Sequence, residues 1–253
     1  MRRYLLSLLV TLLSAGFAGA ADTLPRILLY TRNGLTVDGK KGYVHDNIPN
    51  SIVAIRKLGA ENGFAVDVSD SASVFTDTNL ARYRALVFSN TNNEILDTGE
   101  QKAALQRFLH RGGGFVGIHS ACGSMRSWPW FWAMLGGSFV RHPKIQEFTI
   151  HTVERGHPST AHLPATWRWT DEFYFLRDMP ADLKPLLAGD LTTLDDPKKP
   201  ADETTRPLAW YHEFEGGRCW YTTLGHRKES YSDPIFVQHI LGGIKWVLAR
   251  PKT

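Results

Sequence analysis

The amino-acid sequence predicts an α/β protein with a mostly parallel central sheet and helices on both faces. Two patterns predict it: short apolar runs alternate with amphipathic helical segments, and glycine-containing turns separate the two. The chain of 253 residues, 43% of them apolar, is long enough to fill one large core. Its 2 cysteines exclude a disulfide-stapled miniprotein, and its 22 glycines and 13 prolines, spread along the chain, exclude a coiled coil.

Four apolar runs predict the parallel strands, and three helical patterns predict the helices between and after them. The strands are expected at 26–30, 64–68, 84–88 and 115–118. A first helix is expected from residue 48 to Gly63, after polar capping residues at 45–47. Further helices are expected at 99–111 and 234–249.

The second half of the sequence has the pattern of antiparallel strands. Residues 147–153 alternate between apolar and polar side chains. The runs 207–214 and 218–224 flank the turn Glu215-Gly216-Gly217, which predicts a hairpin. No linker divides the chain, so we expect one domain over 26–250, with antiparallel additions in its C-terminal half.

Residues 1–20 have the pattern of a secretory signal peptide. Arg2 and Arg3 precede an apolar run shorter than a membrane span, and Ala18-Gly19-Ala20 supplies the small residues of a cleavage site. We therefore expect an exported protein, periplasmic or secreted, with no membrane span in the mature chain. Cleavage removes the two arginines and lowers the formal net charge from +4 to +2, and no long Lys/Arg run remains to bind nucleic acid.

The sharpest local motif is Gly117-Ile118-His119-Ser120-Ala121. A strand followed by a turn with small residues on both sides of a polar one is typical of a nucleophile elbow, which exposes the central side chain above the sheet. The central residue here is His119 rather than Ser or Cys. We expect a functional histidine at this turn, although the same pattern suits a core histidine after a glycine-rich strand.

Other polar residues follow the predicted strands and are expected at the same edge of the sheet. His45 follows the first strand, and Asn90 to Asn93 follow the third. Ligands of open α/β sheets collect at this edge, and imidazole and carboxylate groups suit both proton transfer and a divalent metal such as Zn, Mn, Ni or Fe. The predicted catalytic residues are His119, Glu172 and Asp171, and the predicted metal ligands are His45, His119 and His226.

Aromatic side chains provide candidate sugar-binding surfaces, because their faces can pack against the C–H faces of pyranosides. Trp128 and Trp130 follow the elbow directly, although a buried helix start explains them equally well. The predicted substrate-binding residues are Asn92, Trp128, Trp130, Tyr174 and His142. The sequence has no phosphate loop and no GxGxxG fingerprint, so no nucleotide cofactor is expected.

These motifs together are similar to those of the ThuA-like, or trehalose-utilisation, family. The similar stretches, in family order, are 112–121, His142-Pro143, His157-Pro158, 171–174, 208–212, 216–218 and Gly225-His226. The resemblance implies a flavodoxin-like fold related to the class I glutamine amidotransferases. Their activity does not follow, because His119 stands where they have a cysteine nucleophile. The chain also departs from the family at Tyr43-Val44-His45, where Phe-Arg-His is usual.

The resemblance further implies a role in the breakdown of disaccharides such as trehalose, together with an oxidoreductase that oxidises a glucoside at C3. A ketone at C3 acidifies the C2–H, so the glycosidic bond can break by elimination, and histidine is a suitable base. We therefore expect an enzyme that processes a 3-keto glycoside or disaccharide by His-based, metal-assisted elimination, hydration or isomerisation.

Two other functions remain open at this point. One is a non-catalytic carbohydrate-binding protein with the tryptophans as its platform. The other is a thiol hydrolase that uses Cys122 with His226. An oxidising compartment would permit a disulfide between Cys122 and Cys219, but we expect two buried, unpaired thiols.

Overall fold

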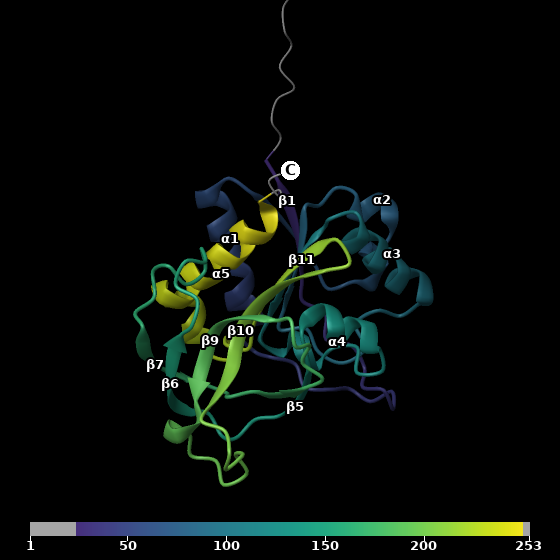
Figure 1. Cartoon of the computed structure of the whole chain (residues 1–253). Helices are drawn as coiled ribbons and strands as arrows, with labels where there is room; N and C mark the ends of the chain where they lie inside the picture. Colours follow the sequence, from purple (N-terminus) through teal and green to yellow (C-terminus); the bar gives the residue numbers. More distant parts are fainter. Residues whose placement is uncertain (1–23, 250–253) are drawn as a thin grey trace, which may run out of the picture.

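A nine-stranded mixed sheet forms the centre of the protein, in the strand order β2-β1-β3-β4-β11-β10-β9-β6-β7. The computed structural model describes residues 24–249, so the predicted signal peptide at 1–20 lies outside the described residues. Helices cover both faces of the sheet (Figure 1). Within residues 24–249, no helix has both the length and the apolar character needed to cross a membrane.

Five strands make up the parallel half of the sheet. They are β1 (Arg26–Tyr30), β2 (Ala65–Ser69), β3 (Ala85–Ser89), β4 (Gly114–Ile118) and β11 (Gly217–Thr222). The first four confirm the predicted strands to within one residue at each end. All residues of β3 and β4 are buried, because helices cover them on both sides.

The other half of the sheet is antiparallel, so the expectation of a mostly parallel sheet holds only in part. Its strands are β10 (Thr205–Phe214), β9 (Lys184–Asp190), β6 (Gln146–Thr152) and β7 (Thr166–Asp171). The predicted hairpin is β10 with β11, and the alternating segment is β6. Neither β9 nor β7 was predicted. Pro185 and Gly189 give β9 the composition of a turn, and the tryptophans of β7 suggest an aromatic cluster rather than a strand.

Two apolar cores lie on the two faces of the sheet. Helices α1 (Ile48–Asn62) and α5 (Pro234–Leu248) pack on one face. Helices α3 (Gly99–His110) and α4 (Pro129–Leu135), with the short α2 (Asp77–Leu80), cover the other. A capping box of Thr98 and Gln101 begins α3, and the Asp233 side chain caps α5. These polar side chains accept hydrogen bonds from the free backbone N–H groups of each first turn.

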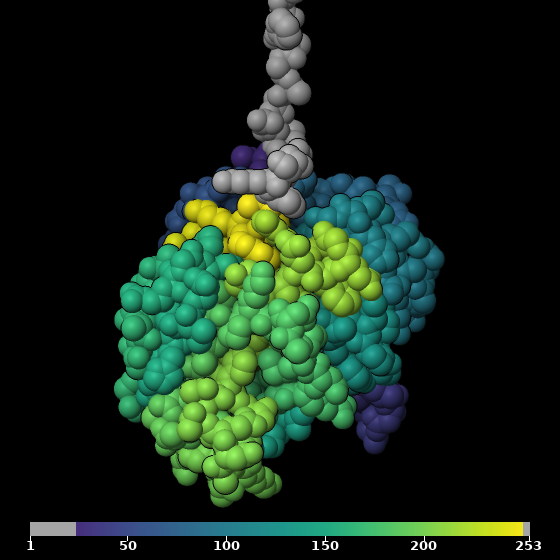
Figure 2. All heavy atoms as spheres, viewed as in Figure 1, coloured from purple at the N-terminus to yellow at the C-terminus, as the bar shows by residue number. Residues whose placement is uncertain are grey.

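The remaining elements are short. The strands β5 (Ser138–Arg141) and β8 (Phe175–Arg177) form a separate two-stranded sheet. The 3-10 helices are η1 (Ala72–Val74), η2 (His119–Gly123), η3 (Leu191–Thr193) and η4 (Lys228–Ser232). Figure 2 shows the loop between β9 and β10 projecting from the body at the lower end of the view. Cys122 and Cys219 are both buried and unpaired, which confirms that prediction.

Candidate metal centre and active site

The predicted site residues approach one another because several strands end at the same edge of the sheet. His119 directly follows β4, and the segment after β11 carries His226. The strand β7 also runs in the direction of β4, because the four antiparallel pairings between β11 and β7 restore that direction. Its carboxyl end therefore brings Glu172 to the edge that carries His119, although the sequence between them contains several turns.

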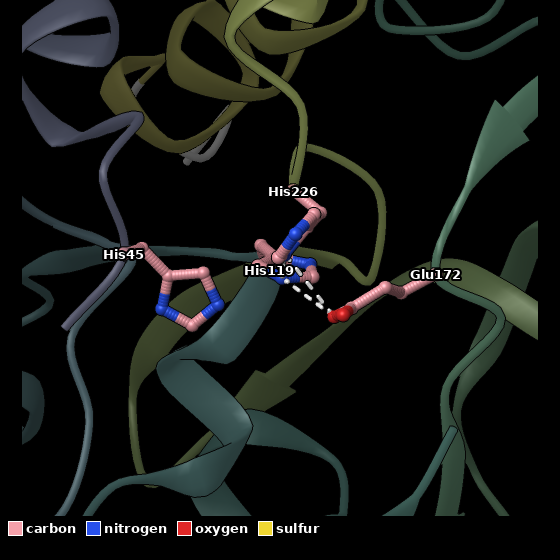
Figure 3. Close-up of side chains that lie close together, drawn as sticks. All are labelled: His45, His119, Glu172 and His226. Carbon is pink, nitrogen blue, oxygen red and sulfur yellow. Dashed lines mark hydrogen bonds and ion pairs between the residues drawn. The ribbon is translucent and has the colours of Figure 1, made fainter. Parts of the chain in front are cut away.

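Four side chains converge at this edge: His45, His119, Glu172 and His226, which we call the His–Glu cluster (Figure 3). Each offers one ligand atom, and these atoms all lie within 4.8 Å of one another. The first three residues are buried and His226 is nearly so. The four come from four separate segments of the chain, as Figure 3 shows by their ribbon colours.

His119 occupies a strained turn that fixes its ring. Its φ of 52° lies in the left-handed region, which the small residues around it permit. Its Nδ1–H donates to the carbonyl of Thr223 at 2.7 Å, so Nε2 carries the lone pair and points into the cluster. The elbow was predicted to expose this side chain, but His119 has no exposed surface, because Tyr174, His45 and His226 pack around it.

His45 is held as a neutral imidazole on the side of the cluster opposite Glu172 (Figure 3). Its Nδ1 lies 3.2 Å from the Ser120 hydroxyl, which can accept a hydrogen bond from Nδ1–H. Nε2 is then free to bind a cation. Burial, reinforced by repulsion from His119 and His226, lowers the pKa of His45 to about 2. The side chain is therefore neutral at physiological pH, as a metal ligand must be.

Glu172 carries the negative charge of the cluster. Burial alone would raise its pKa, but the neighbouring imidazoles of His119 and His226 outweigh burial and hold the pKa of Glu172 well below its usual range. His226 shows the reciprocal effect. Burial opposes protonation, yet the Glu172 carboxylate raises the pKa of His226 above its ordinary value. A carboxylate that is ionised and surrounded by imidazoles attracts either a proton or a metal cation.

The spacing of three groups fits one metal ion. The distances are 3.3 Å from His119 Nε2 to His226 Nδ1, 3.2 Å from His226 Nδ1 to Glu172 Oε2, and 3.5 Å from His119 Nε2 to Glu172 Oε2. Ligands bound at roughly 2.0–2.1 Å to a tetrahedral ion lie roughly 3.4 Å apart. Two imidazole nitrogens that face each other this closely also repel unless a proton or a cation lies between them. The residues present therefore fit a divalent metal with His and carboxylate ligands.

Asp171 was predicted to be catalytic, and the structure gives it a different position. Its carboxylate accepts four N–H groups, from Trp169 Nε1, Glu172 N, Gly225 N and His226 N, at 2.8 to 3.1 Å. The residue is completely buried, and these four bonds occupy the acceptor sites of both oxygens. Asp171 thus ties the end of β7 to the segment after β11 and fixes Glu172 and His226 relative to each other.

Asn47 supports the same segment from the first helix. It was expected to cap α1, but its side chain makes no cap hydrogen bond. Its Nδ2 instead donates to the carbonyls of Gly225 at 2.7 Å and His226 at 2.5 Å. Tyr231 donates to the Gly225 carbonyl as well. Sequence reasoning missed these positioning residues, because the contacts join segments 178 residues apart.

Tyr174 and His142 line the solvent side of the cluster. The Tyr174 hydroxyl donates to His119 Nε2 at 2.9 Å. His142 donates from Nδ1 to the Pro143 carbonyl, and its Nε2 lies 3.5 Å from Glu172 Oε1. The His142 side chain is 36% exposed, so it separates the buried carboxylate from solvent. It also lines a cavity of about 400 Å³ with the loop residues 195–198.

Asn92 orders the loop before His45 and does not itself enter the cluster. Its backbone pairs with Arg32 and Gly34, and its side chain lies 3.5 Å from the Tyr43 carbonyl. Asn92 therefore positions the segment that carries His45. Sequence reasoning also missed Ser120 and Thr223: the first could have been noticed as the residue after His119, whereas a backbone carbonyl leaves no sequence signal.

The structure does not bring Trp128 and Trp130 to the cluster. Their indoles stack on each other at 4.9 Å, and Trp130 Nε1 donates to Glu215 in the turn between β10 and β11. That turn lies at the amino end of β4, opposite His119, because Arg218 pairs with Gly114. The tryptophans lie half-buried at the start of α4, so the alternative explanation, a helix start, holds for their position but not for full burial.

Cys122 is not placed as a nucleophile. The thiol is buried, and its Sγ donates to the His119 carbonyl at 3.5 Å. Burial raises the pKa of Cys122 to about 12, so the thiolate is scarce at neutral pH. The buried position and the raised pKa both argue against a thiol hydrolase.

Comparison with known proteins agrees with the fold. The sequence model of one family, described as "ThuA: Trehalose utilisation", matches residues 34–247. A ThuA-like protein from Bacteroides uniformis is similar in structure, with a TM-score of 0.71, 22% identity, and coverage of 94% of this chain and 97% of that chain. A ThuA-like protein from Parabacteroides merdae has a TM-score of 0.67 and 19% identity over 90% of this chain and 93% of that chain. No curated protein sequence matches this chain.

Proposed function

Because this chain belongs to the ThuA, or trehalose-utilisation, family, we propose that it is an enzyme that processes a 3-keto glycoside or disaccharide at the His–Glu cluster with the help of a divalent metal. We also propose that the fold is related to that of the class I glutamine amidotransferases, without their activity. A carbohydrate-binding protein is the weaker hypothesis, since its tryptophan platform lies at the opposite edge of the sheet.

The convergence of three imidazoles and one carboxylate within 4.8 Å carries the proposal. His45 is neutral and Glu172 is ionised at physiological pH, which are the protonation states that metal binding requires. The hydrogen bonds of His119 to Thr223 and of His45 to Ser120 are the kind that orient metal-bound histidines. His45, His119, Glu172 and His226 would hold the ion.

The chemistry that we propose is elimination across C1–C2 of a glycoside that is already a ketone at C3. The bound metal would supply Lewis-acid stabilisation of the negative charge that develops on the C3 oxygen. His142 would accept the C2 proton, because its Nδ1–H donates to the Pro143 carbonyl and its Nε2 keeps a lone pair. The bond from C1 to the glycosidic oxygen breaks, the oxygen leaves with the proton that His142 took from C2, and a C1–C2 double bond forms.

Several residues would hold the substrate for this step. The Tyr174 hydroxyl lies beside His119 Nε2 and can donate a hydrogen bond to a substrate oxygen there. The cavity of about 400 Å³ beside His142 has room for the leaving sugar or aglycone. We further propose that the protein acts after export and that a sugar oxidoreductase supplies the ketone.

Elemental analysis of the purified protein and a His119→Ala variant tests the metal centre. We expect close to one equivalent of Zn, Mn, Ni or Fe in the wild type and its loss in the variant. His212→Ala is a matched control, because His212 is buried, bonds to the Met134 carbonyl and lies outside the cluster. Glu172→Gln provides a second test if His119→Ala does not fold. Absence of metal from the wild type after incubation with each of the four ions would overturn the metal centre.

Turnover is tested separately with a methyl 3-keto-glucoside as the probe. We expect the metal-loaded wild type to release methanol and form an unsaturated ketone without consuming water, and His142→Ala to lose this activity while retaining the metal. Metal binding without any turnover of the keto-glycoside would overturn the proposed reaction and leave the centre in place.

A further inference from the structure

An arginine without a carboxylate partner among the described residues lies near the exposed side of the His–Glu cluster. This side is bordered by Tyr43 and His142, and we call it the opening. Arg126 is exposed, its Nε donates to the Gly123 carbonyl at 3.1 Å, and its guanidinium lies 5.8 Å from the centroid of the Phe139 ring. Within residues 24–249, no carboxylate oxygen comes within 4 Å of this guanidinium. Glu94, on the neighbouring loop, accepts from the Ser127 hydroxyl instead. The backbone contact therefore holds the arginine in place and leaves its two terminal NH₂ groups free.

One side of the opening connects Arg126 to the cluster through stacked rings. The Phe139 ring under the guanidinium lies 4.6 Å from the Tyr174 ring. The Tyr174 ring lies 4.5 Å from that of His119, and its hydroxyl reaches His119 Nε2. His142 stacks on Tyr174 at 5.7 Å and completes this aromatic side.

The other side of the opening leads from Arg126 to His45. Gly123 has no side chain, which allows the Arg126 guanidinium and the Asn92 side chain to approach each other over its Cα. The Asn92 side chain contacts the Tyr43 carbonyl, and the exposed Tyr43 ring packs edge-on against His45 at 4.8 Å. Two sets of aromatic residues therefore link Arg126 to the cluster. Phe139 and Tyr174 form one side of the opening, and Tyr43 forms the other.

Five other cations near this edge of the sheet are already neutralised. Each forms an ion pair with a nearby carboxylate: Arg32 with Asp97, Arg141 with Asp196, Lys144 with Asp195, Arg227 with Glu229 and Lys228 with Asp46. Arg126 differs from them because it contacts the Gly123 carbonyl and the Phe139 ring instead of a carboxylate. A guanidinium presents paired N–H donors that match the two oxygens of a carboxylate or a phosphate.

We propose that Arg126 binds an anionic substituent of the sugar while the reacting carbons lie at the His–Glu cluster. The substrate is then a sugar acid or a sugar phosphate rather than a neutral disaccharide. This inference rests on the proposed function, because it assumes that the cluster binds a sugar. The Phe139 ring lies against the guanidinium.

Calorimetric titration of the zinc-loaded protein tests the inference with three probes: methyl glucoside, its uronic acid methyl glucuronide, and glucose 6-phosphate. We expect at least one charged sugar to bind tenfold or more tightly than the neutral one, and added salt to reduce the difference. Preference for the glucuronide identifies a carboxylate ligand, and preference for the phosphate identifies a phosphate ligand. Arg126→Gln should abolish the preference, and Arg126→Lys should restore part of it.

Arg32→Gln is the matched control, since Arg32 is an arginine of the same edge that already pairs with Asp97. It should keep the full preference. Equal binding of charged and neutral sugars to the wild type would overturn the inference and leave the proposed function standing, as would a preference that survives in Arg126→Gln. Failure of all three probes to bind the zinc-loaded wild type would overturn the inference, whereas the proposed function is decided by turnover of the keto-glucoside.

Discussion

Replacing Asp171 with Asn tests whether this buried carboxylate holds the candidate site together. The carboxylate accepts N–H groups from Trp169, Glu172, Gly225 and His226 at 2.8 to 3.1 Å. An asparagine keeps one acceptor oxygen and replaces the other with an NH₂ donor. Two of the four N–H groups would then face a donor and lose their partner, whichever way the amide turns.

The expected cost follows from those two groups. Each buried donor without an acceptor costs roughly 1–3 kcal/mol, so the variant should lose roughly 2–6 kcal/mol of unfolding free energy. The segment that carries His226 would also lose one of its backbone anchors. Loss of outer contacts of this kind typically lowers metal affinity by roughly 10- to 100-fold. We therefore expect Asp171→Asn to weaken both folding and zinc binding.

Two measurements separate these effects. Urea unfolding of the metal-free protein gives the stability, and zinc titration against a competing chelator gives the affinity. Asp190→Asn is the control, because Asp190 caps η3 through Thr192 and bonds to His151, both remote from the cluster. It should lose some stability and keep the affinity for zinc. A folded Asp171→Asn protein that binds zinc as tightly as the wild type would refute the reasoning.

Three further predictions concern other parts of the molecule. Burial lowers the pKa of His157 from 6.5 to about 4 and that of His239 to about 3, so only the unfolded chain takes up these protons as the pH falls below about 6.5. Stability should be complete above that pH and decline toward pH 3, and an unchanged decline in a His239→Gln variant, measured by urea unfolding, would contradict this. The Cys122 thiol, whose pKa burial raises to about 12, should react with iodoacetamide only after unfolding; modification of the native protein, detected by mass spectrometry, would show the argument to be wrong. In Gly117→Ala, the new Cβ would lie 2.8 Å from Tyr221 Cδ2, which should cost roughly 1–3 kcal/mol by urea unfolding. Gly99→Ala, where no atom lies within 4 Å of the new Cβ, should cost much less.

The sequence predicts the parallel half of the fold well because its signals are local. The runs of β1 and β3 are continuously apolar, and Gly63 ends α1 with a φ of 72°, which favours glycine. The antiparallel half is harder, because Pro185 and Gly189 make β9 look like a turn and only pairing with β10 and β6 keeps it extended. Tertiary contacts decide the structure there.

The candidate site divides in the same way. His45, His119, Glu172 and His226 could be proposed because imidazole and carboxylate groups are visible in the sequence at strand ends, and the structure brings these four together. The role of Asp171 could not be predicted, because two of its four partners are backbone N–H groups from a segment about 54 residues away. Asn47 resembles a helix cap in the sequence, and only the folded chain shows that it binds the Gly225 and His226 carbonyls.

The wide separation of the four cluster residues along the chain determines when the site can form during synthesis. His45 emerges from the ribosome early, but its three companions follow over the next 181 residues, and the last of them, His226, comes just before η4 and α5. No N-terminal fragment that stops before His226 contains all four ligands, so a growing chain cannot acquire the ion as a complete ligand set. In the proposed centre, the metal would therefore be chosen late, by whichever ions surround the chain when its final strand and helix fold. A chain folded in zinc-rich and one folded in manganese-rich medium could carry different ions in the same site.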